Sequence, residues 1–318
     1  MSKLQSLKLN PPLIALMLAI GLFFLGGLIR PGFVNANQAI NIVRLAAFLG
    51  IIAAGLTFVI LSGGEGIDLS IGAVVTLAAI LAFRLNEGQN ELVPYALAVA
   101  LAAGTFIGLL NGLGVAFLKI PPLVMTLGMA GVVQGLILAI TQGQMIGDTA
   151  PIMGRYISAP LLLGIPGVVF IWLILAGLIW LLLERSAYGK QLYGIGVNRV
   201  TSRLSGVRVP LIVLVTYSLS GLLAAFGGFM LLGFTQTVFM NLGGPYLFPS
   251  VAAVVVGGTA LSGGKGSYWG TMAGALVLTL ITSLLTAMQL PEAFRQITLG
   301  VILLVLISVY GRQRGLRQ

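Results

Sequence analysis

The chain has 318 residues, of which 58% are hydrophobic and only 8% are charged. A soluble domain carries about 25% charged residues because its surface faces water, so this composition excludes a water-soluble globular protein. The chain contains no cysteine and no histidine, which excludes disulfides, thiolate chemistry and histidine or cysteine metal sites. The composition predicts an integral membrane protein with no metal site and no cofactor.

The net charge is +10, a value that is also found in proteins that bind nucleic acids. In a chain this apolar, however, Lys and Arg are expected at the ends of membrane helices, where they set orientation. We therefore predict membrane lipid around the chain and no nucleic-acid partner.

The first apolar run, Pro12–Ile29, follows two basic residues, Lys3 and Lys8. A cleaved signal has an apolar region of about 7–15 residues before a small-residue cleavage site. This run is longer, and Arg30-Pro31 follows it. It is therefore predicted to be an uncleaved first span.

Further apolar runs are long enough to cross a bilayer, which takes about 20 residues in a helix. A shorter run, Phe248–Leu261, is either a short span or a re-entrant element, and with it the count is ten. The sequence thus predicts an all-α polytopic fold, with residues 1–318 forming a single transmembrane domain. The other predicted spans are Leu45–Leu61, Leu69–Phe83, Tyr95–Phe117, Leu123–Thr141, Leu161–Leu183, Pro210–Leu232, Gly270–Met288 and Ile297–Tyr310.

Ten spans place both termini on one side of the membrane. With the termini inside, twelve of the 17 basic residues fall on inner segments, as the positive-inside rule expects. Both termini are therefore predicted to be cytoplasmic. The other five basic residues fall on outer segments, and these are Arg30, Arg44, Arg84, Arg155 and Arg295.

The stretch Ser62–Gly72, SGGEGIDLSIG, interrupts two apolar runs with four glycines and two acids. Glycine permits backbone conformations that break a helix, and a charge facing lipid is costly. Glu65 and Asp68 are therefore expected near the interface or in a polar cavity. Asp68 is interpreted as an N-cap of a helix starting near Leu69, with contact to a substrate, a gate or a partner as the alternatives.

A short repeat links distant parts of the chain, since Leu61–Gly66 is LSGGEG and Leu261–Gly266 is LSGGKG. Both copies face inward in the ten-span arrangement, so the pattern predicts an internal parallel repeat. LSGG also begins the signature of ABC-type ATPases. The phosphate-binding sequence Gly-x-x-x-x-Gly-Lys-Ser/Thr is missing, so this chain is predicted not to hydrolyse ATP.

Isolated polar residues lie inside the apolar runs, among them Ser218 and Ser220. They either form hydrogen bonds between helices or line the path of a polyol. No pattern supports enzyme chemistry, and buried acids of the kind used by proton-coupled carriers are scarce. The candidates for the substrate pathway are Asp68, Ser70, Asn111, Thr126 and Gln134.

The inner segment Glu184–Val209 is too polar to span the bilayer and carries five basic residues against one acid. We expect one or two short helices lying on the cytoplasmic face. The segment is either a solvated loop or a docking site for a cytoplasmic partner.

Four stretches, taken together, resemble bacterial ABC-importer permeases of the ribose, xylose and galactose type, which are related to branched-chain amino-acid permeases. The similarity runs from about residue 40 to residue 310. The family form SGGIDLSVG departs here by an inserted Glu65-Gly66. The stretches are VILSGGEGIDLSIGAVVTL (59–77), LKIPPLVMTLGM (118–129), YGIGVNRVTSRLSGVRV (193–209) and VAAVVVGGTALSGGKGSYWGTMAGAL (251–276).

The resemblance implies an ABC-importer permease fold that works as a dimer with a second permease copy, identical or homologous. It also implies a cytoplasmic ABC ATPase subunit and a periplasmic sugar-binding protein. The segment 184–209 then becomes a cytoplasmic coupling loop. Residues implied to couple to the ATPase are Asn198, Arg199, Ser205 and Gly206.

The leading hypothesis is a permease subunit that moves a monosaccharide or related polyol across the bacterial inner membrane, and not an enzyme. The alternatives are an ion-coupled secondary transporter, an ABC permease for amino acids or another small polar solute, and a non-transporting sensor or scaffold.

Overall fold

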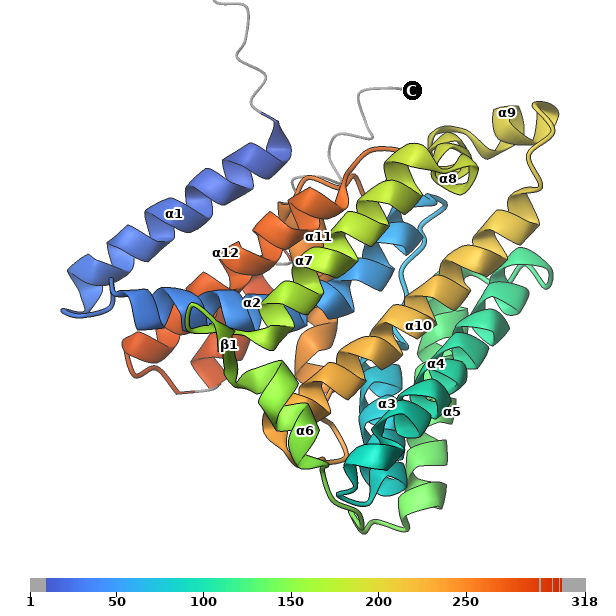
Figure 1. Cartoon of the computed structure of the whole chain (residues 1–318). Helices are drawn as coiled ribbons and strands as arrows, with labels where there is room; N and C mark the ends of the chain where they lie inside the picture. Colours follow the sequence, from blue (N-terminus) through green and yellow to red (C-terminus); the bar gives the residue numbers. More distant parts are fainter. Residues whose placement is uncertain (1–9, 292, 299, 303, 305–318) are drawn as a thin grey trace, which may run out of the picture.

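A computed structural model describes residues 10–291, 293–298, 300–302 and 304. The fold is α-helical, with one small two-stranded hairpin (Figure 1). The main helices are α1 Pro11–Ile29, α2 Ala36–Leu61, α3 Ile71–Asn86, α4 Val93–Ala116, α5 Pro122–Thr141, α7 Gly167–Trp180, α8 Ala187–Val197, α9 Arg199–Leu204, α10 Val209–Thr235, α11 Leu247–Val256 and α12 Tyr268–Ala287. The short elements are η1 Asn90–Leu92, α6 Pro151–Met153, η2 Gly154–Ser158, β1 Pro160–Leu162, β2 Ile165–Pro166, η3 Leu181–Arg185 and η4 Gly244–Tyr246.

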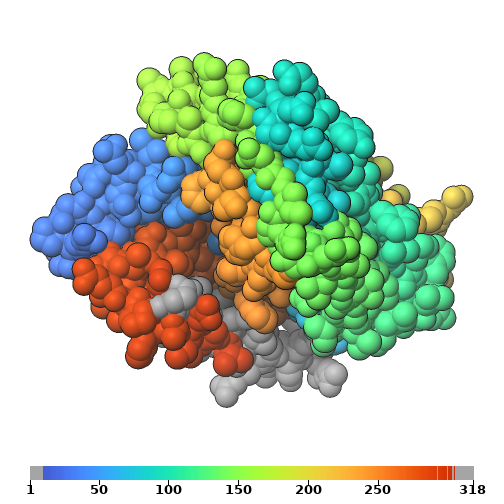
Figure 2. All heavy atoms as spheres, turned by 90° about the horizontal axis from the view of Figure 1, so that it is seen from below, coloured from blue at the N-terminus to red at the C-terminus, as the bar shows by residue number. Residues whose placement is uncertain are grey.

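Helix α2 is the centre of the molecule. Its most apolar 18-residue window is 83% buried inside the protein, against 17% for α1, so α2 packs on protein over most of its length while α1 lies at the edge. Helices α1 and α12 lie on one side of α2, and α10 with α4 and α5 on the other (Figure 1). The view from below shows the same division (Figure 2).

Close helix crossing depends on glycine. Gly104, Gly108 and Gly112 recur every four residues along the face of α4 that meets α10. A Cβ on Gly108 would clash with the carbonyl oxygen of Tyr217, and one on Gly104 with that of Gly221. Because small residues let backbones approach, as in other membrane proteins, the α4–α10 pair forms the most extensive helix contact in the described structure.

Seven helices of the described chain are long and apolar enough to cross a membrane, and α3 is a shorter apolar helix. Helix α11 has ten residues and rises about 15 Å, half the hydrocarbon core of about 30 Å. The predicted span Ile297–Tyr310 and both chain ends fall largely or wholly outside the described residues.

Two predicted boundaries are wrong. Residues 161–166 of the predicted span Leu161–Leu183 belong to the β1–β2 hairpin, and the helix begins only at Gly167. Leu163 at the hairpin turn has a φ of 53° and is 88% exposed. Arg44 lies within α2 and not in an outer loop, because α2 begins at Ala36; its guanidinium donates to Asn41 Oδ1 at 2.6 Å and stacks on Phe234.

The polar segment 184–209 forms the two short helices α8 and α9, as predicted. They lie at the end of the molecule where α1 begins, and the hairpin with α6 lies at the opposite end (Figure 1).

Candidate functional site

The segment between α2 and α3 forms a non-helical break that runs from an exposed turn at Gly64 and Glu65 to the buried residues Asp68 and Ser70. Gly63, Gly64 and Glu65 have φ values of 67°, 64° and 62°, a left-handed conformation that stops a helix. Glu65 is exposed, while Asp68 is only 1% exposed. The two acids therefore have different environments, and Asp68 is the one enclosed by protein.

Asp68 is held by three hydrogen-bond donors. Its Oδ1 accepts from the backbone N–H of Ser70 at 3.0 Å and from the Ser70 hydroxyl at 2.6 Å. Its Oδ2 accepts from the Ser220 hydroxyl of α10 at 2.8 Å. A buried carboxylate is costly unless it is hydrogen-bonded, so these donors explain how the acid is accommodated.

The interpretation of Asp68 as a helix N-cap is wrong. Helix α3 begins at Ile71 and its N-cap residue is Ser70. A capping side chain accepts from the second or third residue of the helix, whereas Asp68 accepts from Ser70, which precedes the helix. Asp68 instead ties the break to α10.

Two more predicted pathway residues join this cluster. Asn111 Nδ2 of α4 donates to the Ser70 hydroxyl at 2.9 Å, and Thr126 Oγ1 of α5 accepts from Leu69 N–H at 3.0 Å. Asn111 Oδ1 is buried with no hydrogen-bond partner in the described structure. Together with Ser220 of α10, the residues Asp68, Ser70, Asn111 and Thr126 thus come from four parts of the chain, while Gln134 is exposed elsewhere on α5.

The two LSGG turns lie directly against each other. Gly264 N–H donates to the Leu61 carbonyl at 2.9 Å, and a Cβ on Gly263 would clash with Gly63. Gly263 and Gly264 have φ values of 86° and 71°, matching the left-handed pair in the first copy. Sequence repetition therefore corresponds to repeated local structure.

The C-terminal end of α8 fits between the two turns. A Cβ on Gly196 would clash with the Leu61 carbonyl oxygen and with Gly264 N. We call Gly63, Gly196, Gly263 and Gly264 the glycine junction. Backbones touch here without intervening side chains, so a displacement of α8 requires both turns to shift.

Two side chains brace the junction. Arg199 Nη2 donates to the Gly63 carbonyl at 3.1 Å, and the Tyr193 hydroxyl donates to the Gly266 carbonyl at 2.9 Å. Burial, with a smaller contribution from Glu184, raises the pKa of Tyr193 to about 12, so the phenol stays a neutral donor at physiological pH. Burial lowers the pKa of Arg199.

The other predicted coupling residues shape α9. Asn198 Oδ1 accepts from Val200 N–H and Thr201 N–H and so caps the helix, the Ser205 hydroxyl donates to the Thr201 carbonyl, and Gly206 has a φ of 84°. The sequence analysis missed three exposed apolar residues on this surface, although their spacing of three and four residues was visible. They are Val197 (71% exposed), Val200 (69%) and Leu204 (84%).

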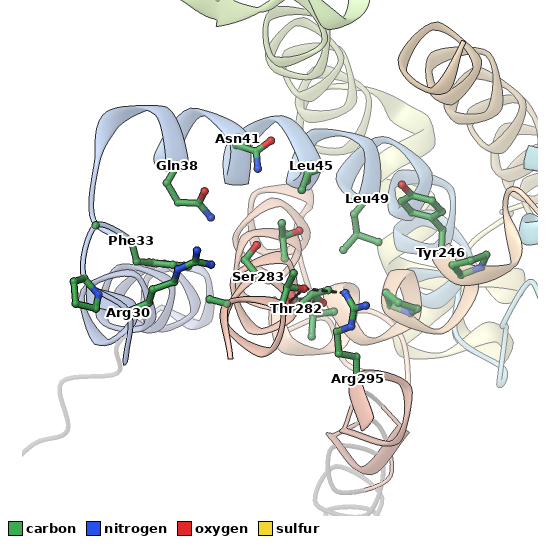
Figure 3. A pocket seen from close by; sticks show the side chains of 18 residues that line it. Arg30, Phe33, Gln38, Asn41, Leu45, Leu49, Tyr246, Thr282, Ser283 and Arg295 are labelled. Atoms are coloured by element: carbon green, nitrogen blue, oxygen red, sulfur yellow. Dashed lines mark hydrogen bonds between the residues drawn. The ribbon is translucent and has the colours of Figure 1, made fainter. Parts of the chain in front are cut away.

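A cavity of about 760 Å³ lies at the other end of α2 and α12, between these helices, the α1–α2 turn and α11 (Figure 3). From Gln38 in its wall to Leu61 at the glycine junction, α2 rises about 35 Å. Amide and hydroxyl groups face the cavity from both helices, and its charged lining residues are Arg30 and Arg295. Those polar groups are Gln38 and Asn41 on α2 and Thr279, Thr282, Ser283 and Thr286 on α12.

The sequence analysis missed this cavity too. The four α12 hydroxyls recur at helical spacing, which was a signal for one polar face. No group of three or more Asp, Glu, His or Cys residues in the described chain is placed to hold a metal ion.

Broken helices, a polar cavity at one end and an exposed apolar surface at the other are typical of one class, the multi-pass membrane transport proteins. Comparison makes this specific: residues 38–307 match the family model described as branched-chain amino acid transport system / permease component. The chain belongs to this family of transport permeases.

Named relatives match nearly the full chain. The Autoinducer 2 import system permease protein LsrC of Shigella flexneri is 33% identical over 98% of this chain and 90% of its own length. The Ribose import permease protein RbsC of Escherichia coli strain K12 is 33% identical over 95% of this chain and 93% of its own length. No solved structure gives a significant match.

Proposed function

We propose that the chain is the permease subunit of an ABC importer for a monosaccharide or related polyol. The observation that carries the proposal is the arrangement along α2 and α12, with a cavity rich in hydroxyl and amide groups at one end and the glycine junction with α8 and α9 at the other. Import permeases for ribose and autoinducer 2 are among the relatives, which supports a sugar-like substrate.

The surface of α8 and α9 is proposed to dock a separate cytoplasmic ABC ATPase. Val197, Val200 and Leu204 expose apolar side chains there, and exposed apolar groups commonly mark protein contacts. Asn198, Ser205 and Gly206 keep α9 in shape, and Arg199 links it to the first LSGG turn. ATP-driven motion of the docked subunit would reach both turns through Gly196.

The remaining assembly follows from this orientation. The cavity end faces the periplasm and receives the sugar from a periplasmic sugar-binding protein, while both termini are cytoplasmic and the protein lies in the bacterial inner membrane. A second permease copy, identical or homologous, completes the pathway. We propose that the helix break changes shape during transport and is held by Asp68, Ser70, Asn111 and Thr126. Gln134 is proposed to occupy an exposed position on the side of α5 that faces the pathway.

The alternatives fit less well. A proton-coupled carrier usually has buried acids that exchange protons, and Asp68, the one buried acid in the described structure, already accepts three hydrogen bonds. An amino-acid permease would be expected to offer a carboxylate to the substrate ammonium group. The described cavity wall contains Arg30 and Arg295 but no acid.

Co-expression with the ATPase and sugar-binding protein encoded beside it tests the proposal. We expect a stable complex that takes up ribose, xylose or galactose in proteoliposomes only when ATP is supplied on the ATPase side. Uptake by this chain alone, abolished by a proton or sodium uncoupler and indifferent to ATP, would contradict it. ATP-driven uptake of leucine but of no sugar would favour the amino-acid alternative.

A further inference from the structure

The polar groups of the cavity are arranged on two facing walls. Gln38 and Asn41 project from α2 toward Thr282 and Ser283 of α12, and Tyr246 closes one end (Figure 3). The same two helices reach the glycine junction at their other ends. A molecule between these walls would therefore contact elements that respond directly to α8.

Several of these groups have hydrogen-bonding capacity to spare. In the described structure the Gln38 side-chain amide and the Ser283 hydroxyl form no hydrogen bond. Thr282 donates to the carbonyl of Leu278 at 3.0 Å, which leaves its oxygen lone pairs for a further bond. Thr286 donates to the carbonyl of Thr282 at 2.8 Å and accepts from Arg295 Nη1 at 2.9 Å. The wall thus offers amide donors and hydroxyl acceptors, the groups that match the many hydroxyls of a polyol.

The size of the cavity suits a small solute with some of its water. Pockets for small molecules are typically about 300–1,000 Å³, and this one has about 760 Å³. Water-bridged contacts are nearly as good as direct hydrogen bonds.

We infer that this cavity is a binding site for the transported monosaccharide, with Gln38 and Ser283 as its hydrogen-bonding residues and Tyr246 as its aromatic wall. The inference rests on the proposed function and adds the site to it. It also separates two roles: the sugar contacts α2 and α12 near their outer ends, while the Asp68 cluster holds the helix break.

Because the chain has no cysteine, a single introduced cysteine reports on one place. We would introduce Gln38→Cys, Ser283→Cys or Asn37→Cys into the complex with its ATPase and binding protein, and measure the rate of labelling by a water-soluble maleimide. Asn37 is the control, because it neighbours Gln38 on α2 but does not line the cavity of about 760 Å³; it lines a second depression, which Gln38 and Asn41 also border.

We expect the sugar that the wild-type complex takes up, from ribose, xylose and galactose, to slow labelling at Gln38→Cys and Ser283→Cys at least about threefold at saturating concentration, since protection scales with occupancy. Labelling at Asn37→Cys should not change. Uptake without protection at either cavity position, or equal protection at all three, would overturn the inference while leaving the proposed function intact. Uptake of none of the three sugars would remove the proposed function and the inference with it.

A kinetic measurement checks the same site without labelling. Gln38→Leu and Ser283→Ala each remove one hydrogen-bonding group that has no partner within the described structure. We expect each to raise the KM for sugar uptake about fivefold, the effect of one lost hydrogen bond, with little fall in maximal rate. Asn37→Leu should leave the KM unchanged. An unchanged KM in both cavity variants would contradict the inference.

Discussion

At the scale of single residues, Asp68 is the one buried acid of the described core. Its carboxylate accepts from Ser70 twice and from Ser220 once, and it lies where a charge could not be left without partners. The acid joins the helix break to α10, while Asn111 reaches the same site from α4. Its first role is therefore to fix the shape of the break.

Replacing Asp68 with alanine would leave three buried donors without an acceptor. We expect Asp68→Ala to lower the free energy of unfolding by about 2–4 kcal/mol, and Asp68→Asn to lower it less because one oxygen remains. The measurement is the unfolding midpoint of the purified permease in detergent. Glu91→Ala, at an exposed position, is the control, and equal midpoints for all variants would refute the role assigned to Asp68.

The sequence was a partial guide at this scale. Asp68, Ser70, Asn111 and Thr126 were identifiable one by one as polar residues in apolar runs. Their convergence was not, because it depends on how four segments pack. Gln134 has the same local pattern yet is exposed, because the sequence alone does not tell which side of a membrane helix packs on protein. The α12 hydroxyls were overlooked because Thr and Ser also bond to the carbonyl four residues earlier in their own helix.

At the scale of elements, the glycine junction is a rigid backbone contact between the two LSGG turns and the C-terminal end of α8. Alanine in a helix interior is normally more favourable than glycine by about 0.5–1 kcal/mol. The junction reverses this expectation wherever a Cβ would meet backbone.

Two glycines of α8 offer a matched pair. We expect Gly196→Ala to weaken coupling, so that the assembled importer hydrolyses ATP at a normal rate but takes up several-fold less sugar per ATP, because α8 no longer seats between the turns. Gly194→Ala is the control, since its nearest neighbour would be Ser202 Oγ at 3.4 Å. The measurement is the ratio of sugar uptake to ATP hydrolysis in proteoliposomes. Equal ratios for the Gly196→Ala and Gly194→Ala variants would contradict the prediction.

The α4–α10 crossing permits a similar comparison for stability. We expect Gly108→Ala to lower the free energy of unfolding by about 1–3 kcal/mol, because overpacking forces the helices apart. Gly128→Ala on α5 should be neutral, since no atom outside its own helix lies within 4 Å of the position. Thermal unfolding of the two variants side by side tests this. An unchanged unfolding temperature for Gly108→Ala would contradict the prediction, because it would show that the crossing accommodates an added methyl group.

Element boundaries were less predictable than element existence. The run before α7 is apolar, and hydropathy cannot distinguish an apolar hairpin such as 160–166 from the start of a span. Arg44 looked like the edge of a span, but a guanidinium with Asn41 and Phe234 beside it is tolerated inside α2. The short helices of 184–209 could be predicted, because a polar, glycine-rich sequence is too polar to form a membrane span.

At the scale of the whole molecule, the two ends have different characters. One carries α8 and α9 with exposed apolar side chains, and the other carries the β1–β2 hairpin (Figure 1). The positive-inside rule predicts that the α8–α9 end faces the cytoplasm, because five basic residues lie in the segment 184–209.

The orientation is open to a direct test with single cysteines. We expect Ser205→Cys, next to α9, to react with an impermeant maleimide only from the cytoplasmic side, and Leu163→Cys, at the hairpin turn, only from the periplasmic side. Labelling of whole cells against inverted vesicles distinguishes the two. Reaction of both positions from the same side would contradict the arrangement.

The hydrogen bond from Gly264 to the Leu61 carbonyl has a consequence for biogenesis. During synthesis α2 enters the bilayer long before the second LSGG turn exists, because most of the chain separates the two. Until then the Leu61 carbonyl has no partner from that turn and Gly63 has no neighbour from it. The core helix is thus inserted early but takes its final position late, after nearly the whole permease has left the ribosome.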